Sequence, residues 1–433
     1  MKKTFIAFLL FFTISTELFS QGNWQTIPFT PSSIRFDDMN FSNDSTGYIS
    51  QFSEVYQTTD RGENWYLISL LDSFTNYYVR SVEFINDTVG FSGLLESNFG
   101  LSGNLYKTMD GGFTWSLLQN MQIQPSDGIC GMAHYGNSLV AVGTWSYPAW
   151  FYRTNDQGSS WFKKDLSALA SGLVDCYMFN SDTIVVSGIA DSLNQYRATI
   201  LKSFDGGNTW QRVYLAPATN QSSYCWKMFF RPNGLGISSI EGGPAIIART
   251  TDNGNTWTTI SVYNNTNSDL GGIGLLNDTL GWVTDQHSSG TWETHNGGLN
   301  WNAVTSDVIS GDRMVVIDSV TALMAGLSIY KYQIGLVGIN EQELTKKNIY
   351  DLFIYPNPSA ELVTIEAIAE TNTYGLLDIL NENGGLVQHI ARQPFRKGKN
   401  SFTVNVENLP AGNYKLLWRN NERFIIRSLT VIK

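Results

Sequence analysis

Short apolar runs separated by polar turns recur along almost the whole chain. A run often ends in a turn of the Asn-Asp-Thr-X-Gly kind, as at Asn86–Gly90 and Asn277–Gly281, and a second short run follows it. Asn, Asp and Gly favour turn backbones, whereas short apolar runs bounded by such turns are typical of strands. The pattern therefore predicts an all-β chain built from short antiparallel strands.

An eight-residue phrase interrupts this pattern at regular intervals. Its third positions are residues 60, 110, 156, 205, 252 and 296, so the steps between copies run from 44 to 50 residues. Asp followed by X-Gly supplies a hairpin turn, and we expect the closing Trp to anchor the outgoing strand. The turn residue and the Trp are Asp60 and Trp65, Asp110 and Trp115, Asp156 and Trp161, Asp205 and Trp210, Asp252 and Trp257, and Asn296 and Trp301. Asn replaces Asp in the sixth copy, where we expect a weaker turn.

The spacing of the phrase suits one four-stranded propeller blade per repeat. After the sixth copy, a last unit at Met314–Tyr332 lacks the hairpin and its outer strand. Gly22–Ile27 resembles the outgoing strand of a repeat without its turn, so it is predicted to supply the missing strand. The sequence therefore predicts a seven-bladed β-propeller closed by both ends of residues 21–338, which leaves no free sheet edge.

The tail of the chain has a different pattern. Residues 339–351 are polar and are predicted to be a linker, and residues 352–433 contain alternating runs that predict a small C-terminal β-sandwich. Asp and Glu number 27 against 15 Lys and Arg in residues 21–340, but 7 against 9 in residues 352–433. We therefore expect two separate domains, of which the first carries the acidity.

The N-terminal residues predict a signal peptide over residues 1–20. Lys2 and Lys3 precede an apolar stretch that ends before a small residue, Ser20. The stretch is shorter than the roughly 20 residues that span a bilayer, and no later segment approaches that length. The chain is therefore predicted to be exported and to have no transmembrane segment.

Both parts resemble known families. The eight-residue phrases resemble the Asp box (BNR repeat) of the sialidase-like and photosystem II assembly factor-like propellers. In the tail, Phe353–Ser359, Leu409–Tyr414 and a last strand ending at Lys433 resemble the type A C-terminal sorting domain of the type IX secretion system of Bacteroidetes, although Ile426-Arg427 stands where Gly or Lys is usual. The second resemblance implies type IX secretion machinery as a partner, a secreted or surface-attached protein, and usually removal of the tail.

Asp boxes mark a fold and leave the function open. Sialidases have an Arg-Ile-Pro phrase before the first box, where this chain has Ser33–Phe36, and xyloglucanases bind substrate between two propellers, whereas one is predicted here. The four His residues are scattered, and no HExxH, GxSxG or P-loop phrase occurs. We therefore expect no catalytic residues, no metal and no cofactor.

Net charge and cysteine positions bear on the possible partners and on the role of the cysteines. The net charge of −10 and the pI near 4.9 argue against nucleic acid as a partner. Cys130, Cys176 and Cys225 fall at equivalent places in three successive repeats. They are predicted to be small buried side chains, with a disulfide between neighbouring blades as the alternative.

Aromatic residues gather in loops that are predicted to lie opposite the Asp hairpins. Such residues suit stacking on sugars or contact with a protein, although packing between blades is the competing interpretation. The candidate binding residues are Tyr77, Tyr78, Phe99, Trp145, Tyr147, Trp150, Tyr196, Arg197 and Tyr224. The predicted function is a secreted or cell-surface propeller that binds a glycan or a protein. The alternatives are a secreted glycoside hydrolase of sialidase-like fold and an envelope assembly or maturation factor.

Overall fold

The computed structural model describes residues 22–27, 35–51, 53–71, 79–95, 105–121, 127–143, 147–192, 195–286, 290–305, 309–334, 351–369, 373–381, 386–420 and 424–433. Every element of regular secondary structure within these ranges is a β-strand, and the strands are numbered β1 to β35. This confirms the all-β prediction. Among the described residues, no helix is long and apolar enough to cross a membrane.

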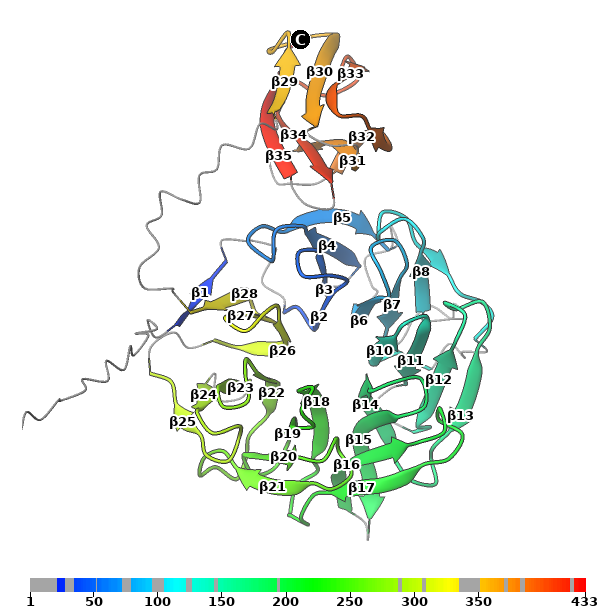
Figure 1. Cartoon of the computed structure of the whole chain (residues 1–433), viewed down its shortest axis with the longest axis vertical. Helices are drawn as coiled ribbons and strands as arrows, with labels where there is room; N and C mark the ends of the chain where they lie inside the picture. The colour runs from blue at the N-terminus through cyan, green and yellow to red at the C-terminus, as the bar shows by residue number, and fades with distance from the viewer. Residues whose placement is uncertain are drawn as a thin grey trace, which may run out of the picture.

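Seven four-stranded antiparallel sheets form a ring of blades (Figure 1). Blades one to three are β2 (Asp38–Phe41), β3 (Gly47–Gln51), β4 (Glu54–Thr58) and β5 (Tyr66–Leu70); β6 (Val79–Phe84), β7 (Gly90–Leu94), β8 (Leu105–Thr108) and β9 (Ser116–Leu117); and β10 (Gly131–Tyr135), β11 (Ser138–Val142), β12 (Trp150–Thr154) and β13 (Phe162–Asp165). Blades four to six are β14 (Gly172–Met178), β15 (Ile184–Ser192), β16 (Gln195–Ser203) and β17 (Gln211–Leu215); β18 (Tyr224–Phe230), β19 (Gly236–Glu241), β20 (Ile246–Thr250) and β21 (Thr258–Ser261); and β22 (Leu270–Leu275), β23 (Gly281–Asp285), β24 (Gly290–Thr294) and β25 (Asn302–Ala303). The seven-bladed propeller is confirmed.

The seventh blade joins the two ends of the propeller, as predicted. It consists of β26 (Gly311–Val316), β27 (Thr321–Gly326), β28 (Ile329–Gln333) and, as its outer strand, β1 (Asn23–Thr26). β1 pairs antiparallel with β28, and Trp24 lies opposite Tyr332. The Trp24 ring is buried, with its centroid 5.1 Å from that of Trp282 in blade six and 5.5 Å from that of Tyr332. The chain therefore closes its ring through β1.

Each Asp hairpin is held by its own side chains. In the first copy, Asp60 Oδ1 accepts hydrogen bonds from Thr58 Oγ1 (2.7 Å) and from the backbone N–H of Asn64 (2.9 Å), and Trp65 Nε1 donates to the Gly62 carbonyl (3.2 Å). Gly62 has a φ of 81°, a backbone region that favours glycine. The Arg61 N–H also donates to the carbonyl of Ser45, so the hairpin lies beside the turn between the first two strands. These two sets of turns therefore share one end of the ring, which we call the hairpin face.

The sixth copy keeps its backbone contacts although its turn residue is Asn296. Its Oδ1 accepts hydrogen bonds from the N–H groups of Leu299 (3.1 Å) and Asn300 (2.9 Å), as the carboxylates do elsewhere. An amide oxygen therefore forms the same turn without a charge.

This comparison leads to a prediction for Asp252 in the fifth copy. Asp252→Ala is expected to destabilise the propeller by about 1–2 kcal/mol, because it leaves two backbone N–H groups without their acceptor. Asp252→Asn is expected to lose less stability than Asp252→Ala at pH 7, because its amide oxygen can still accept both N–H groups, as Asn296 does. Equal losses for the two variants would show that the charge, rather than the oxygen, holds the turn.

The same hairpins predict a loss of stability in acid. Burial opposes ionisation of Asp252, but hydrogen bonds from Thr256 and Thr250 outweigh it and lower its pKa to about 2. Because the folded pKa lies below the ordinary value of 3.8, this stabilisation is complete above that value and is lost as the pH falls through about 2. Asp252→Asn is expected to lose less stability than the wild type between pH 4 and pH 2 when both are followed by thermal unfolding.

The C-terminal domain is a sandwich of two sheets, as predicted. One sheet holds β29 (Asp351–Tyr355), β30 (Leu362–Ala369) and β33 (Gly398–Asn405), and the other holds β31 (Thr373–Asn381), β32 (Leu386–Phe395), β34 (Gly412–Asn420) and β35 (Phe424–Val431). Its core includes Val363 and Ile365 from the first sheet and Leu377, Leu416 and Trp418 from the second. The alternating residues of the tail thus face a core that is separate from the blades.

Candidate functional site

The innermost strands of the blades line the central axis, and a cavity opens between them. It has a volume of about 410 Å³, and the lining residues lie toward the hairpin face, where each inner strand meets its first turn. We call it the axial cavity. Eighteen residues line it, of which twelve are apolar, counting Tyr177 and Cys176. Five are methionines from five different inner strands, namely Met39, Met132, Met178, Met228 and Met314.

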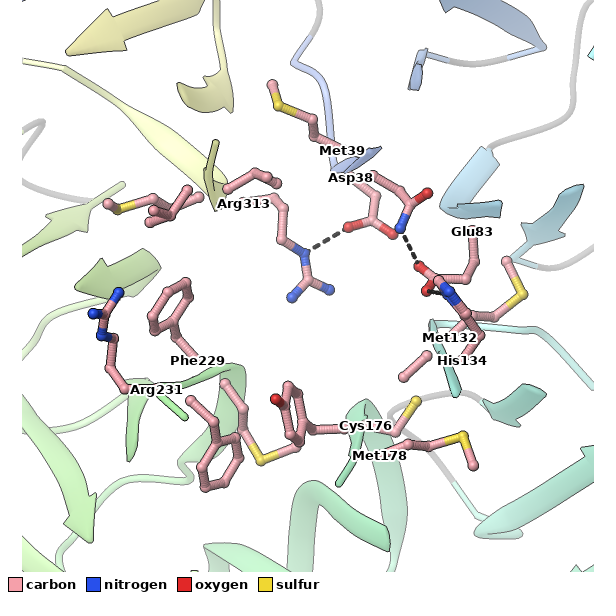
Figure 2. A pocket seen from close by; sticks show the side chains of 18 residues that line it. Asp38, Met39, Glu83, Met132, His134, Cys176, Met178, Phe229, Arg231 and Arg313 are labelled. Atoms are coloured by element: carbon pink, nitrogen blue, oxygen red, sulfur yellow. Dashed lines mark hydrogen bonds and ion pairs between the residues drawn. The ribbon is translucent and has the colours of Figure 1, made fainter. Parts of the chain in front are cut away.

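Six polar residues complete the lining. They are Asp38, Asn40, Glu83, His134, Arg231 and Arg313. Figure 2 shows the Arg313 guanidinium pointing into the cavity, with Glu83 and His134 together on one wall and Arg231 on the opposite side. The five methionines are 3–5% exposed and pack in the cores between blades. The cavity therefore combines apolar residues with hydrogen-bonding groups, which is the general composition of ligand sites.

Glu83 and His134 form a hydrogen-bonded pair at the wall. Glu83 Oε1 lies 2.7 Å from His134 Nδ1, and Oε2 accepts a hydrogen bond from Asn40 Nδ2 (2.9 Å). Burial raises the pKa of Glu83. Burial opposes protonation of His134, but the hydrogen bond and the charge of Glu83 outweigh it, so the pKa of His134 is also raised. The pair holds its proton more tightly than either group would alone.

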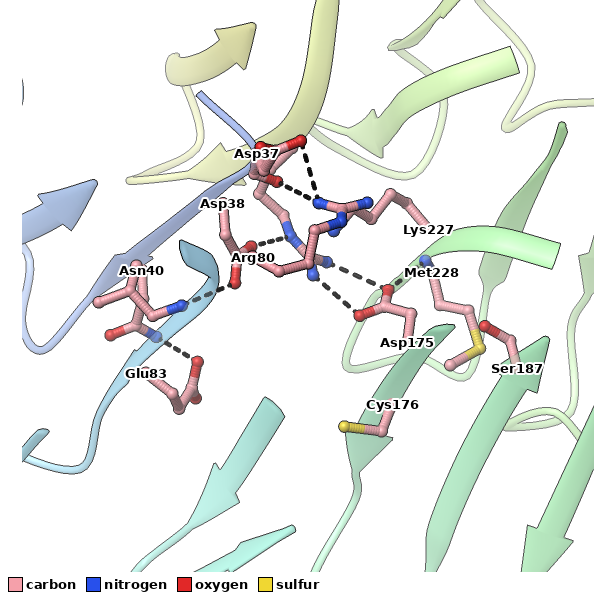
Figure 3. Close-up of polar contacts among 12 residues, drawn as sticks. Asp37, Asp38, Asn40, Arg80, Glu83, Asp175, Cys176, Ser187, Lys227 and Met228 are labelled. Atoms are coloured by element: carbon pink, nitrogen blue, oxygen red, sulfur yellow. Dashed lines mark hydrogen bonds and ion pairs between the residues drawn. The ribbon is translucent and has the colours of Figure 1, made fainter. Parts of the chain in front are cut away.

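Arg313 of blade seven joins the carboxylates of Asp38 in blade one and Asp175 in blade four, and Figure 3 shows these two carboxylates. Its Nε donates to Asp38 Oδ1 (2.6 Å), while Nη2 and Nη1 donate to the two oxygens of Asp175 (2.8 and 3.2 Å). The same carboxylates also accept hydrogen bonds from backbone N–H groups of inner strands. The N–H of Val82 donates to Asp38 (3.2 Å), and the N–H of Met228 donates to Asp175 (2.8 Å). The two acids therefore connect neighbouring blades and neutralise a guanidinium at once.

Further ion pairs lie beside Arg313 and its two carboxylates. Arg80 lies 3.3 Å from Asp37 and stacks on Trp226, with its guanidinium carbon 4.7 Å from the ring centroid. Arg35 lies 2.9 Å from Asp37 and 3.7 Å from Asp312. With Lys227, four cations face four carboxylates, Asp37, Asp38, Asp175 and Asp312. We call these eight residues the charge layer.

An apolar cluster packs at the opposite end of the inner strands. Leu95, Cys130, Val174 and Trp226 are buried against one another, and they come from blades two, three, four and five. Cys130, Cys176 and Cys225 are buried and free, so the prediction of small buried side chains is confirmed and the disulfide alternative is wrong.

Lys227 is the member of the charge layer whose burial is least compensated. Its side chain is 1% exposed, and Nζ has no hydrogen-bond partner among the described residues. Burial and the nearby Arg313 and Arg80 lower its pKa to about 8, despite Asp38 and Asp175. The positive charge of Lys227 therefore destabilises the folded chain at neutral pH.

This leads to a prediction for Lys227→Met, which keeps the length of the side chain. At pH 7 the variant is expected to be more stable than the wild type, by about 1 kcal/mol or more. Since the folded pKa lies below the ordinary 10.5, the wild type gains stability as the pH rises from about 8 to 10.5, and the advantage of the variant shrinks over that range. Urea denaturation from pH 7 to pH 10 measures both effects. A variant that is less stable than the wild type at pH 7 would contradict the prediction.

The aromatic residues predicted to bind a ligand do not meet at one place. Tyr77, Tyr78, Phe99 and Trp145 lie outside the described residues. Tyr147 and Tyr196 are 72% and 50% exposed, whereas Tyr224 is half-buried against the apolar cluster.

The two remaining candidates, Arg197 and Trp150, have contacts that are structural. Arg197 Nε donates to the carbonyl of Ala216 (2.7 Å). Trp150, which we expected in an exposed loop, is instead the first residue of β12, is half-buried, and has Lys163 Nζ 3.8 Å above its ring.

Sequence reasoning missed the axial cavity, although a signal for it exists. Met132, Met178 and Met228 each lie a few residues before the first turn of their repeat, and Met39 and Met314 do the same in blades one and seven. Aligning the repeats on their inner strands, rather than on the Asp hairpin, would have shown methionine recurring there.

Comparison with known proteins supports both parts of this description. A family model described as "Photosynthesis system II assembly factor YCF48" matches residues 190–333, and one described as "Secretion system C-terminal sorting domain" matches residues 353–432. No curated protein sequence matches the chain. Part of the propeller, residues 190–333, is thus similar to YCF48, and residues 353–432 match a C-terminal sorting domain, which supports a secreted or cell-surface protein handled by the type IX secretion system.

Solved structures share the fold at low sequence identity. A YCF48 bound to a D1 peptide is 17% identical, with a TM-score of 0.53, over 72% of this chain and 97% of that one. PorZ, a surface component of the type IX secretion system of Porphyromonas gingivalis, is 13% identical, with a TM-score of 0.51, over 94% of this chain and 60% of that one. A GH74 xyloglucanase from Xanthomonas campestris is 11% identical, with a TM-score of 0.55, over 94% and 69%. These likenesses concern the fold alone.

Proposed function

We propose that this secreted or cell-surface protein is a binding protein without catalytic activity, and that its ligand enters the axial cavity from the hairpin face. The observation that carries the proposal is the cavity itself, which lies on the propeller axis and is lined by both polar and apolar residues of the inner strands. A rigid ring that presents one concave site on its axis suits recognition.

The state of the polar groups favours binding over hydrolysis. Most glycoside hydrolases need two carboxyl groups, one acid and one nucleophile or base, on either side of the scissile bond, whereas sialidases use a tyrosine nucleophile. Here Asp38 is held by Arg313, and Glu83 is held by His134 and Asn40. These contacts fix the carboxylates within the protein.

Binding is tested with a variant that fills the cavity. Ala133 lines the cavity on β10 and is half-buried, so Ala133→Arg places a long side chain in it. Ala303→Arg is the matched control, because Ala303 is exposed on the outer strand β25. Residues 21–433 of the wild type and of both variants are screened on a glycan array and a peptide array.

The two activities give different outcomes. We expect at least one arrayed ligand to bind the wild type and Ala303→Arg but not Ala133→Arg. Release of reducing sugars from an arrayed glycan by the wild type, abolished in Glu83→Gln, would instead establish a hydrolase. Retention of every bound ligand by folded Ala133→Arg would place the binding site elsewhere.

A further inference from the structure

We propose that the Asp hairpin of blade two is a docking site for the chain's own C-terminal sorting domain. The contact holds this domain at one place on the propeller, with one of its two sheets turned toward the blades. Phe113 is the centre of the site on the propeller. It does not line the axial cavity, so this inference is independent of the proposed function.

Phe113 is buried at a position that is exposed in every other Asp hairpin. It is the sixth residue of the repeated phrase, and the residues at this position in the other copies, all exposed, are Glu63, Ser159, Asn208, Asn255 and Leu299. Leu299, the other apolar residue among them, is 49% exposed, whereas Phe113 is 9% exposed. The turn itself does not explain this difference, because the third residue of the phrase accepts the N–H of the sixth at 3.1 Å in both copies. Phe113 therefore has neighbours that the equivalent residues lack.

Two residues of the sorting domain are among these neighbours. The centroid of the His389 ring lies 6.0 Å from that of Phe113, and the two rings meet edge to face at 81°. Leu376 is half-buried against the apolar cluster of blades one and two to which Phe113 belongs. Leu377 faces the core of the sorting domain, so Leu376 lies on the other face of its sheet. The four-stranded sheet of the sorting domain thus presents a leucine and an imidazole ring to the hairpin.

Each side of the contact is held in place by its own domain. In the sorting domain, His389 Nδ1 lies 2.6 Å from Oδ1 of Asp378, which is buried. In the propeller, Trp115 Nε1 donates to Ser69 Oγ (3.0 Å), which anchors the hairpin of blade two to β5 of blade one. Figure 1 shows the sorting domain beside β5. Surfaces that are already ordered lose little conformational entropy when they meet, which favours docking.

The contact is small, and it depends on the two domains being parts of one chain. Joining two binding surfaces covalently raises their effective concentration, so a contact too weak to hold separate molecules together can still form. In this position β29, β30 and β33 lie on the side of the sorting domain away from the blades (Figure 1). Docking therefore determines which sheet of the domain faces the propeller and which faces outward.

Photo-cross-linking within residues 21–433 tests the proposal. p-Benzoylphenylalanine replaces Phe113 in one protein and Leu299, at the equivalent exposed position, in a second. We expect irradiation of the first protein to join residue 113 to β31 or β32 of the same chain, and irradiation of the second to give no cross-link to the sorting domain. Adding Leu376→Asp to the first protein is expected to abolish the cross-link. Mass spectrometry of proteolytic peptides identifies the joined residues.

The reverse probe tests the same contact if Leu376→Asp does not fold. p-Benzoylphenylalanine in place of Leu376 is expected to capture the hairpin of blade two, and folded Phe113→Ser, but not Leu299→Ser, is expected to remove this cross-link. Cross-links that are spread over the propeller, or that persist in folded Leu376→Asp or Phe113→Ser, would overturn the inference. Cross-links that join two chains, seen as a dimer on a denaturing gel, would also overturn it, because the hairpin would then hold a second copy.

Discussion

Trp24→Ala is expected to destabilise the propeller by about 3–5 kcal/mol. The ring is 5% exposed and packs on Trp282 and Tyr332, so its removal leaves a cavity between blades six and seven. Trp24 also lies on the strand that closes the ring of blades, and the β1–β28 pairing joins residues near the two ends of the propeller. Loss of its packing therefore weakens the closure as well as the local core. Urea denaturation followed by tryptophan fluorescence measures the change.

Tyr147→Ala is the control for this prediction. Tyr147 is 72% exposed, so its truncation is expected to change the stability by less than about 0.5 kcal/mol. Trp150 does not serve as a control, because it is half-buried and contacts Lys163. Equal losses for Trp24→Ala and Tyr147→Ala would refute the role of Trp24 in closure.

The blades could be predicted because their determinants are local. Thr58, Asp60, Gly62 and Trp65 form the hydrogen bonds of one hairpin within eight residues, and the phrase recurs in six of the seven blades. The strand at Asn23–Thr26 could be assigned to the last blade because one repeat lacked its outer strand. The repeated motif therefore identifies six blades, and the unit that lacks it identifies the seventh blade and the way the ring closes.

The charge layer could not be predicted in the same way. Arg313 is 275 residues from Asp38 and 138 residues from Asp175 along the chain, and closure of the ring brings the three together. These residues do not recur from repeat to repeat, so the period of the sequence contains no sign of the pairing. Aromatic residues in predicted loops can be identified from the sequence. Which inner-strand residues meet on the propeller axis cannot.

Arg313→Met is expected to destabilise the protein by about 3–5 kcal/mol, because it leaves Asp38 and Asp175 buried without their counter-ion. In the wild type, burial opposes ionisation of Asp175, but the charge of Arg313 outweighs it and keeps the pKa of that carboxyl lowered. Without Arg313, burial dominates and Asp175 is expected to take up a proton more readily. The deficit of the variant should therefore shrink as the pH falls from 7 to 5, which thermal unfolding at several pH values measures.

Two comparisons separate a lost ion pair from a lost side chain. Arg231→Met removes another arginine of the cavity, but that arginine pairs with the exposed Asp278, so we expect a loss of about 1 kcal/mol or less. Adding Asp38→Asn and Asp175→Asn to Arg313→Met removes the buried charges while amide oxygens can still accept the N–H groups of Val82 and Met228. This triple variant is expected to be more stable than Arg313→Met alone. If it is instead less stable, the carboxylates stabilise the ring by a route other than Arg313, and the charge layer does not link the blades as described.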